Sequence, residues 1–89
     1  MKLRFFEARR YFHGASKPGE EYLVDLDENG GAGKCSCPDF EFRIQPEIDA
    51  GRPGRDCRHL RTIRTVDDYA KALHVKESEL CEMINKIMA

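Results

Sequence analysis

The chain has 89 residues, of which 40% are hydrophobic, and a formal net charge of −1. This length allows one domain with a small core, and a charge near zero argues against a protein that binds nucleic acid over its whole surface. No run approaches the roughly 18 consecutive apolar residues of a membrane helix. We therefore expect a cytoplasmic protein without a membrane partner.

The first part of the chain predicts a small antiparallel sheet of two to three strands. Aromatic side chains over residues 3–12 favour a strand, although a helix is also compatible with this segment. Glycine and proline over residues 14–19 predict a turn. Alternation over residues 22–26 predicts a second strand, and Asn29-Gly30-Gly31 is typical of a hairpin turn. Residues 34–37 then form the returning strand.

A short helix and a loop are expected next. Pro38 suits the first position of a helix, and Phe40 and Ile44 lie one turn apart, so both side chains can cover the sheet. We expect Pro46 to end this helix, because proline has no backbone N–H to donate. Residues 47–56 contain two glycines and a proline, which predicts a loop.

Four residues carry the clearest chemical pattern in the chain. Cys35 and Cys37 form a C-x-C pair, and after 19 further residues Cys57 and His59 form a C-x-H pair. Alternate side chains of a strand point to one face, and a turn that enters a helix can present its first and third residues together. Three thiolates and an imidazole form a closed tetrahedral set for one structural Zn²⁺ ion. A closed set leaves no position for water, so we do not expect an enzyme.

A disulfide framework is the alternative use of four cysteines in a short chain. Charged residues interrupt the start of the chain, so no secretory signal is visible, and intracellular thiols stay reduced. We therefore favour zinc over disulfides and free thiols. Cys81 lies in an apolar helical pattern and is expected to be a buried apolar residue, whereas His13 and His74 are expected to be ordinary polar positions.

The two pairs resemble the SWIM-type zinc finger, whose pattern is C-x-C, a variable insert and C-x-H. The flanking Pro38-Asp39-Phe40 and Leu60 are similar to that family as well. The resemblance implies zinc at all four residues and a module that binds DNA or protein. Together with the predicted strands and helices, the pattern indicates one compact α+β domain with a zinc-clamped ββα finger. The parts are an N-terminal strand and turn at 1–19, the finger at 20–66 and a C-terminal helical extension at 67–89.

Positive charge is concentrated between residues 52 and 64. Five arginines against one aspartate give this segment a local balance of +4; they are Arg52, Arg55, Arg58, Arg61 and Arg64. At about 100° per residue, the last three lie on the helix face opposite to the ligand and the core. A solvated face explains this equally well, but the planar arginine fork favours phosphate and carboxylate partners. We predict nucleic acid, DNA or RNA, as the partner, with an acidic protein as the alternative.

The C-terminal residues predict two helices that break near residues 74–76. Thr65 and Asp68 resemble a capping box, and Tyr69 and Leu73 form an apolar stripe on the first helix. The stripe of the second helix consists of Leu80, Met83, Ile84 and Ile87. We expect it to pack against the finger; the alternative is a homodimer or partner surface on the C-terminal helix.

Overall fold

The computed structural model describes residues 2–14 and 20–88 and has the predicted α+β class. Within these ranges, one antiparallel sheet has four strands in the order β1-β2-β3-β4, one strand more than expected. The strands are β1 (Leu3–Glu7), β2 (Arg10–Gly14), β3 (Glu21–Asp25) and β4 (Lys34–Cys35). Most of the turn predicted at 14–19 lies outside the described residues.

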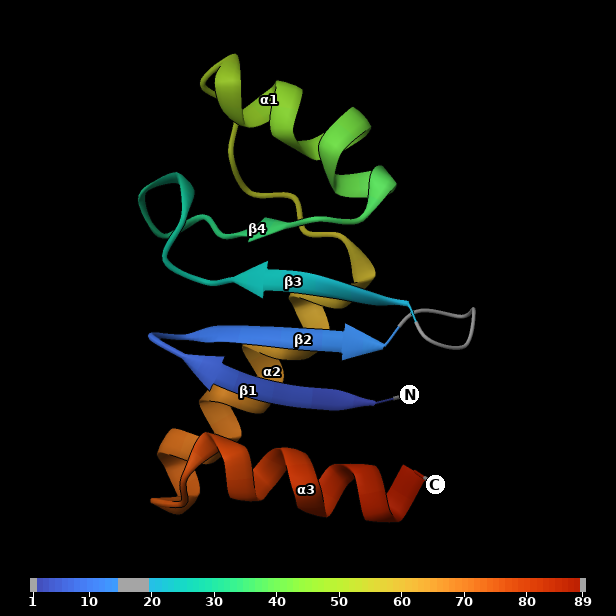
Figure 1. The fold of residues 1–89 in the computed structure, drawn as a ribbon. Coiled ribbons are helices and arrows are strands. Elements are labelled where there is room, and N and C mark those ends of the chain that lie inside the picture. The colour runs from blue at the N-terminus through green and yellow to red at the C-terminus, as the bar shows by residue number, and fades with distance from the viewer. Residues whose placement is uncertain (1, 15–19, 89) are drawn as a thin grey trace.

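The helical segments cover one face and both edges of the sheet. They are a 3₁₀ turn at Asn29–Gly31, a π-helix at Phe40–Ile44, α1 (Gln45–Asp49), α2 (Arg58–Leu73) and α3 (Glu77–Met88). In Figure 1, α2 crosses behind the sheet, α3 runs along β1, and α1 lies beyond β4. No helix among the described residues is both long and apolar enough to cross a membrane.

The core lies between α2 and the inner face of the sheet. Tyr11 and Val24 face each other in the β2–β3 register and are fully buried, as are Leu60 and Ile63 from α2. This arrangement follows from alternation in the strands and from the helical period of α2, which together bring two apolar surfaces into contact. Phe40 is buried as well, as its position in the short helix predicted.

The segment at 3–12 is a hairpin rather than one strand or a helix. Ala8 and Arg9 form a two-residue turn and have φ angles of 48° and 60°. Two-residue hairpin turns need positive φ, which usually selects glycine or asparagine, and neither residue type is present at positions 8 and 9 to signal a turn. Contacts of the Arg9 guanidinium with Asp27 at 2.8 Å and Asp67 at 3.3 Å hold the turn in place.

The prediction that Pro46 ends the short helix was wrong. The π-helix at Phe40–Ile44 runs directly into α1, and Pro46 lies in the first turn of α1. A first-turn proline is tolerated because its missing N–H has no partner within the helix at that position. The connecting loop is therefore shorter than the predicted 47–56.

The two C-terminal helices break where the sequence predicted. His74 ends α2 in the left-handed conformation, with φ of 55°, and α3 begins at Glu77. Thr65 does not cap a helix, because it lies inside α2 and its hydroxyl donates to the Arg61 carbonyl at 3.1 Å. Consequently α2 continues across position 66/67, where the finger was expected to end.

The apolar stripe of α3 divides between the core and the surface. Leu80 is buried and Ile84 packs against the core, whereas Met83 and Ile87 are exposed. The side chain of Asn85 also fixes α3 to the sheet edge. The Leu3 N–H donates to Asn85 Oδ1 at 2.8 Å, and Asn85 Nδ2 donates to the Leu3 carbonyl at 2.7 Å. These two bonds satisfy the backbone N–H and carbonyl of Leu3 at the outer edge of β1.

Candidate metal centre

The structure brings the four predicted ligands into one buried cluster. Cys35 belongs to β4 and Cys37 follows it, while Cys57 is the N-cap of α2 and His59 lies in the first turn of that helix. One ligand atom from each residue lies within 4.8 Å of the others. A tetrahedral ion with bonds of about 2.0–2.3 Å requires ligand atoms roughly 3.5–3.8 Å apart, so small side-chain shifts accommodate one metal ion here.

Backbone pairing orients the first pair of sulfurs. Cys35 faces Val24 in the β3–β4 register. Beyond it, the Ser36 N–H donates to the Leu23 carbonyl at 3.0 Å, and the Ser36 hydroxyl accepts from the Leu23 N–H at 2.9 Å. The chain thus stays extended past the last residue of β4. Cys35 and Cys37 therefore point to the same inner face, as the C-x-C spacing required.

Two sulfurs accept backbone hydrogen bonds at the starts of helical segments. The Phe40 N–H donates to Cys37 Sγ and the Leu60 N–H donates to Cys57 Sγ, each at 3.4 Å. Such donors favour the charged thiolate over the thiol. The thiolate is the form that binds metal. The second pair is similarly compact, with 4.0 Å between Cys57 Sγ and His59 Nδ1.

The pKa values within the cluster diverge because the thiols interact with one another. A hydrogen bond from the Cys35 thiol lowers the pKa of Cys57 to about 5, against the effect of burial. The same bond, together with burial, raises the pKa of Cys35, and burial raises the pKa of Cys37. Cys57 is therefore the first thiolate of the cluster, and it lies at the positive N-terminal end of α2.

Two aromatic side chains pack against His59, and the sequence did not single them out. The rings of His13 and Tyr22 each have their centroids 4.8 Å from that of His59. The prediction that His13 is an ordinary polar position was wrong, since its side chain is buried. Alternation within β2, which also buries Tyr11, was the available signal, because residues 11 and 13 share one face.

His13 is held as a neutral ring. Burial lowers its pKa, and Nδ1 lies 2.9 Å from the Gly14 carbonyl, which assigns the proton to Nδ1. The other nitrogen, Nε2, is buried without a hydrogen-bond partner among the described residues. His13 and Tyr22 thus form an aromatic cover that orients the His59 imidazole from the sheet side.

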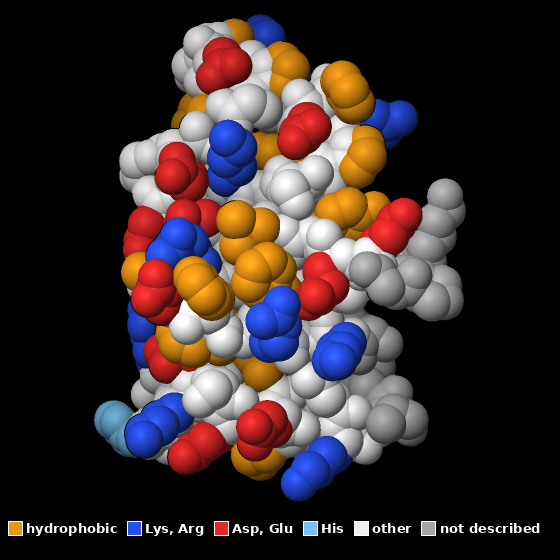
Figure 2. Space-filling view, viewed as in Figure 1, with side chains coloured by type: hydrophobic (Ala, Val, Ile, Leu, Met, Phe, Trp, Pro, Cys, Tyr) orange, Lys and Arg blue, Asp and Glu red, His pale blue; other side chains and the backbone are white. Residues whose placement is uncertain are grey.

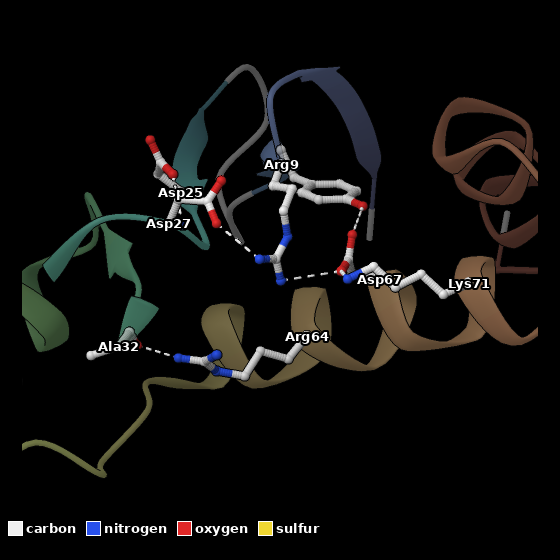
Figure 3. Close-up of polar contacts among 8 residues, drawn as sticks. Arg9, Asp25, Asp27, Ala32, Arg64, Asp67 and Lys71 are labelled. Carbon is white, nitrogen blue, oxygen red and sulfur yellow. Dashed lines mark hydrogen bonds and ion pairs between the residues drawn. The ribbon is translucent and has the colours of Figure 1, made fainter. Parts of the chain in front are cut away.

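The five arginines predicted as a binding surface do not share one environment. Arg52, Arg58 and Arg61 are exposed and form no ion pair within the described part of the chain. Arg55 pairs with Glu47 at 3.3 Å. Arg64 is half-buried, because its side chain turns back to Asp56 at 3.1 Å and to the Ala32 carbonyl, as Figure 3 shows for Ala32.

The position of Arg64 depends on a close approach between α2 and the turn before β4. A Cβ atom at Gly33 would lie 2.9 Å from the Leu60 side chain and 3.0 Å from that of Arg64. Gly33 also has φ of 89°, so glycine is required for both reasons. Helix periodicity could place Arg64 on a face of α2, but only the fold brings it onto the 29–33 turn.

No family model, curated protein or solved structure matches this chain. The resemblance to the SWIM-type zinc finger therefore stays a prediction from the two residue pairs and their flanks.

Proposed function

We propose that this protein is a zinc-stabilised binding module that contacts nucleic acid through the start of α2. The observation that carries the proposal is the position of Arg58, which lies between Cys57 and His59 in the sequence and projects to solvent. A metal held by these neighbours would fix the first turn of α2 against β4. The exposed arginines would then be presented by a rigid element.

Zinc is the ion that best suits the cluster. The donor set of three sulfurs and one imidazole nitrogen is soft, and all four residues are buried. Structural zinc sites use this set in tetrahedral geometry, with no position left for a substrate or water. Zinc would supply on the order of 10 kcal/mol of apparent folding free energy in so small a protein. We therefore assign the ion a structural role and no catalytic reaction.

The free thiols are consistent with a reducing compartment. Each of the four cysteines is unpaired in the structure. Cytosolic thiols stay reduced and are available to a metal, whereas oxidising compartments favour disulfides. We propose the cytoplasm as the location on this chemistry.

Nucleic acid is the partner that exposed arginines at a helix start fit best. The first turn of a helix offers unpaired backbone N–H groups and positive potential, and both attract phosphate. Arg58 lies in this turn and Arg61 one turn further along the same exposed side. Contacts of this kind bind the backbone rather than the bases, so we expect weak sequence preference and strong salt dependence.

An acidic protein is the second candidate partner, because the same arginines pair well with carboxylates. A third candidate is a homodimer through the exposed Met83 and Ile87 of α3, and sedimentation of the purified protein tests it directly. The acidic partner is favoured by the overall pI of about 6.3, which weakens long-range attraction to nucleic acid.

The test compares the wild type with R58A/R61A in binding to short labelled DNA and RNA at about 50 and 200 mM salt. The double variant should retain zinc and fold but bind at least tenfold more weakly, and its log–log salt slope should be shallower by about 1.4–1.8. K76A/K86A is the matched control, because it removes the same charge from exposed positions in the connection between α2 and α3 and on α3. If the wild type binds neither nucleic acid at low salt, the acidic-protein proposal replaces this one.

A further inference from the structure

The outer face of the sheet carries apolar side chains that no helix within residues 2–14 and 20–88 covers. Arg4, Phe12 and Leu23 lie opposite one another in neighbouring strands, and Phe6 lies beside Phe12. Figure 2 shows this face, which is opposite to α2, with hydrophobic side chains gathered over the middle of the sheet. Phe6 is 54% exposed and Leu23 is 38% exposed. A solvated sheet face usually alternates to polar residues, so this apolar cluster needs an explanation.

The aromatic side chains of this face are held in fixed positions. The rings of Phe6 and Phe12 meet edge to face, with centroids 6.1 Å apart. The Arg4 guanidinium lies 4.4 Å from the Phe12 centroid, and that of Arg10 lies 5.1 Å from the Phe6 centroid. Each arginine also pairs with a carboxylate, Glu21 and Glu7 respectively. Side chains that are already ordered in the free protein lose little entropy on binding.

An acidic groove adjoins the apolar cluster at the β3–β4 edge. It has a volume of about 320 Å³ and shares Leu23 with the cluster. The remaining lining residues are Asp25, Glu28, Lys34, Ser36 and Glu41. Three carboxylates therefore face one ammonium group. Glu28 and Glu41 are exposed and make no side-chain hydrogen bond or ion pair within the described ranges.

We propose that the outer sheet face, defined by Phe6, Phe12, Leu23 and the acidic groove, docks a basic apolar segment of a partner protein. An aromatic or aliphatic side chain of that segment packs on the two phenylalanines. A neighbouring lysine or arginine enters the groove and pairs with Glu28 and Glu41. Charge complementarity selects this occupant, because nucleic-acid phosphates would be repelled by the carboxylates beside Leu23. The surface is separate from Arg58 and Arg61 on α2, so the proposal does not depend on nucleic-acid binding.

The experiment uses the zinc-loaded full chain and three fluorescein-labelled peptides of equal length. The first alternates lysine with phenylalanine, the second alternates glutamate with phenylalanine, and the third alternates lysine with serine. We expect the lysine–phenylalanine peptide to bind at least about tenfold more tightly than the other two, because only it satisfies both the apolar cluster and the groove.

Two variants locate the binding site. Phe6→Ala should weaken binding of the lysine–phenylalanine peptide about tenfold, and E28Q/E41Q should weaken it to a similar extent. E79Q/E82Q on α3 is the matched control, since it neutralises two exposed glutamates elsewhere and should leave the affinity unchanged. Because Glu28 and Glu41 are both exposed, E28Q/E41Q should fold normally, so a loss of binding in this variant does not come from misfolding. R58A/R61A should bind the peptide normally, which separates this site from the proposed nucleic-acid surface.

Several results would overturn the docking proposal. One is equal affinity of the wild type for all three peptides, and another is a loss of affinity in E79Q/E82Q as large as that in E28Q/E41Q. If single-stranded nucleic acid displaces the labelled peptide from the wild type but does not bind Phe6→Ala, the outer sheet face binds nucleic-acid bases instead. Sedimentation that shows a dimer dissociated by Phe6→Ala would assign the face to a second copy of the chain.

Discussion

Asp67 provides the sharpest stability test in this fold. Its carboxylate is 1% exposed and lies between the β1–β2 hairpin and α2, as Figure 3 shows. The Tyr11 hydroxyl donates to it at 2.7 Å, and Arg9 and Lys71 pair with it at 3.3 and 3.2 Å. Burial alone would raise the pKa of Asp67, but the hydrogen bonds from Tyr11 and Lys71 outweigh it and hold the pKa below its usual value. The group is therefore charged at neutral pH.

The Asp67→Ala variant should lower the free energy of unfolding by about 1–5 kcal/mol. Arg9 and Lys71 are 42% and 58% exposed, so solvent screening limits each ion pair to about 0–1 kcal/mol. Tyr11 is fully buried, and loss of its acceptor leaves the hydroxyl unsatisfied, which costs about 1–3 kcal/mol. This is a large share of the roughly 5–15 kcal/mol that stabilises a typical domain.

Urea unfolding at a fixed free zinc concentration measures the effect, because bound metal adds to apparent stability. Asp68→Ala is the matched control: it removes the same charge from the next, exposed position and should change stability by less than about 0.5 kcal/mol. In a Tyr11→Phe background, Asp67→Ala should cost less, since no hydroxyl is left unsatisfied. A cost below about 1 kcal/mol, or an equal cost in both backgrounds, would refute this account of the network.

The depressed pKa of Asp67 also fixes the sign of its pH dependence. A carboxyl whose pKa is lower in the folded state stabilises the fold above its unfolded pKa, which is about 3.8 for Asp67. This stabilisation is lost only as the pH falls through the lower, folded value. The difference between the wild type and Asp67→Ala should therefore be constant between about pH 6 and 8. A difference that shrinks within that window would contradict the direction of the shift.

Three further predictions concern single side chains. Cys37→Ser should release the metal, whereas Cys81→Ser, buried outside the cluster, should retain it, as metal analysis of the purified variants will report. Asn85→Ala should destabilise the fold by about 1–3 kcal/mol and increase amide exchange at Leu3, because it removes both bonds to the β1 edge. Ala8→Gly should raise the free energy of unfolding by about 0.5–1 kcal/mol and thus the urea midpoint, since φ is 48° there; a lower midpoint would contradict strain in the turn.

Local periodicity was sufficient where one element alone determines the answer. Alternation at Val24 and Leu26 gave the inner face of β3, and the one-turn spacing of Phe40 and Ile44 gave the buried side of the short helix. The orientation of the residues within the C-x-C and C-x-H pairs could be predicted for the same reason. Each pair is a local geometric unit, and the metal-binding chemistry of sulfur and imidazole donors predicts that the two units meet, as they do in the structure.

Predictions from the sequence failed where contacts with residues far along the chain determine the local conformation. Nothing at Ala8 and Arg9 signals a turn; it depends on carboxylates that lie 18 and 58 residues away from Arg9. The orientation of Arg64 likewise depends on the Ala32 carbonyl, which is 32 residues away. The prediction at Pro46 was wrong for a different reason. A proline in the interior of a helix breaks it, whereas a proline in the first turn is tolerated, and the sequence does not show where in the helix Pro46 lies.

The direction of the exposed face of α2 follows from two separate restraints on that helix. A metal ion bound at the cluster would attach the first turn of α2 to β4 through Cys57 and His59, and Asp67 attaches the third turn to the β1–β2 hairpin. A helix held at one point can rotate about that point, whereas two contacts to opposite parts of a sheet fix both its axis and its rotation. Arg58 and Arg61 must then project away from the sheet. The outer sheet face contains neither restraint, so its side chains can change without altering how α2 presents its arginines.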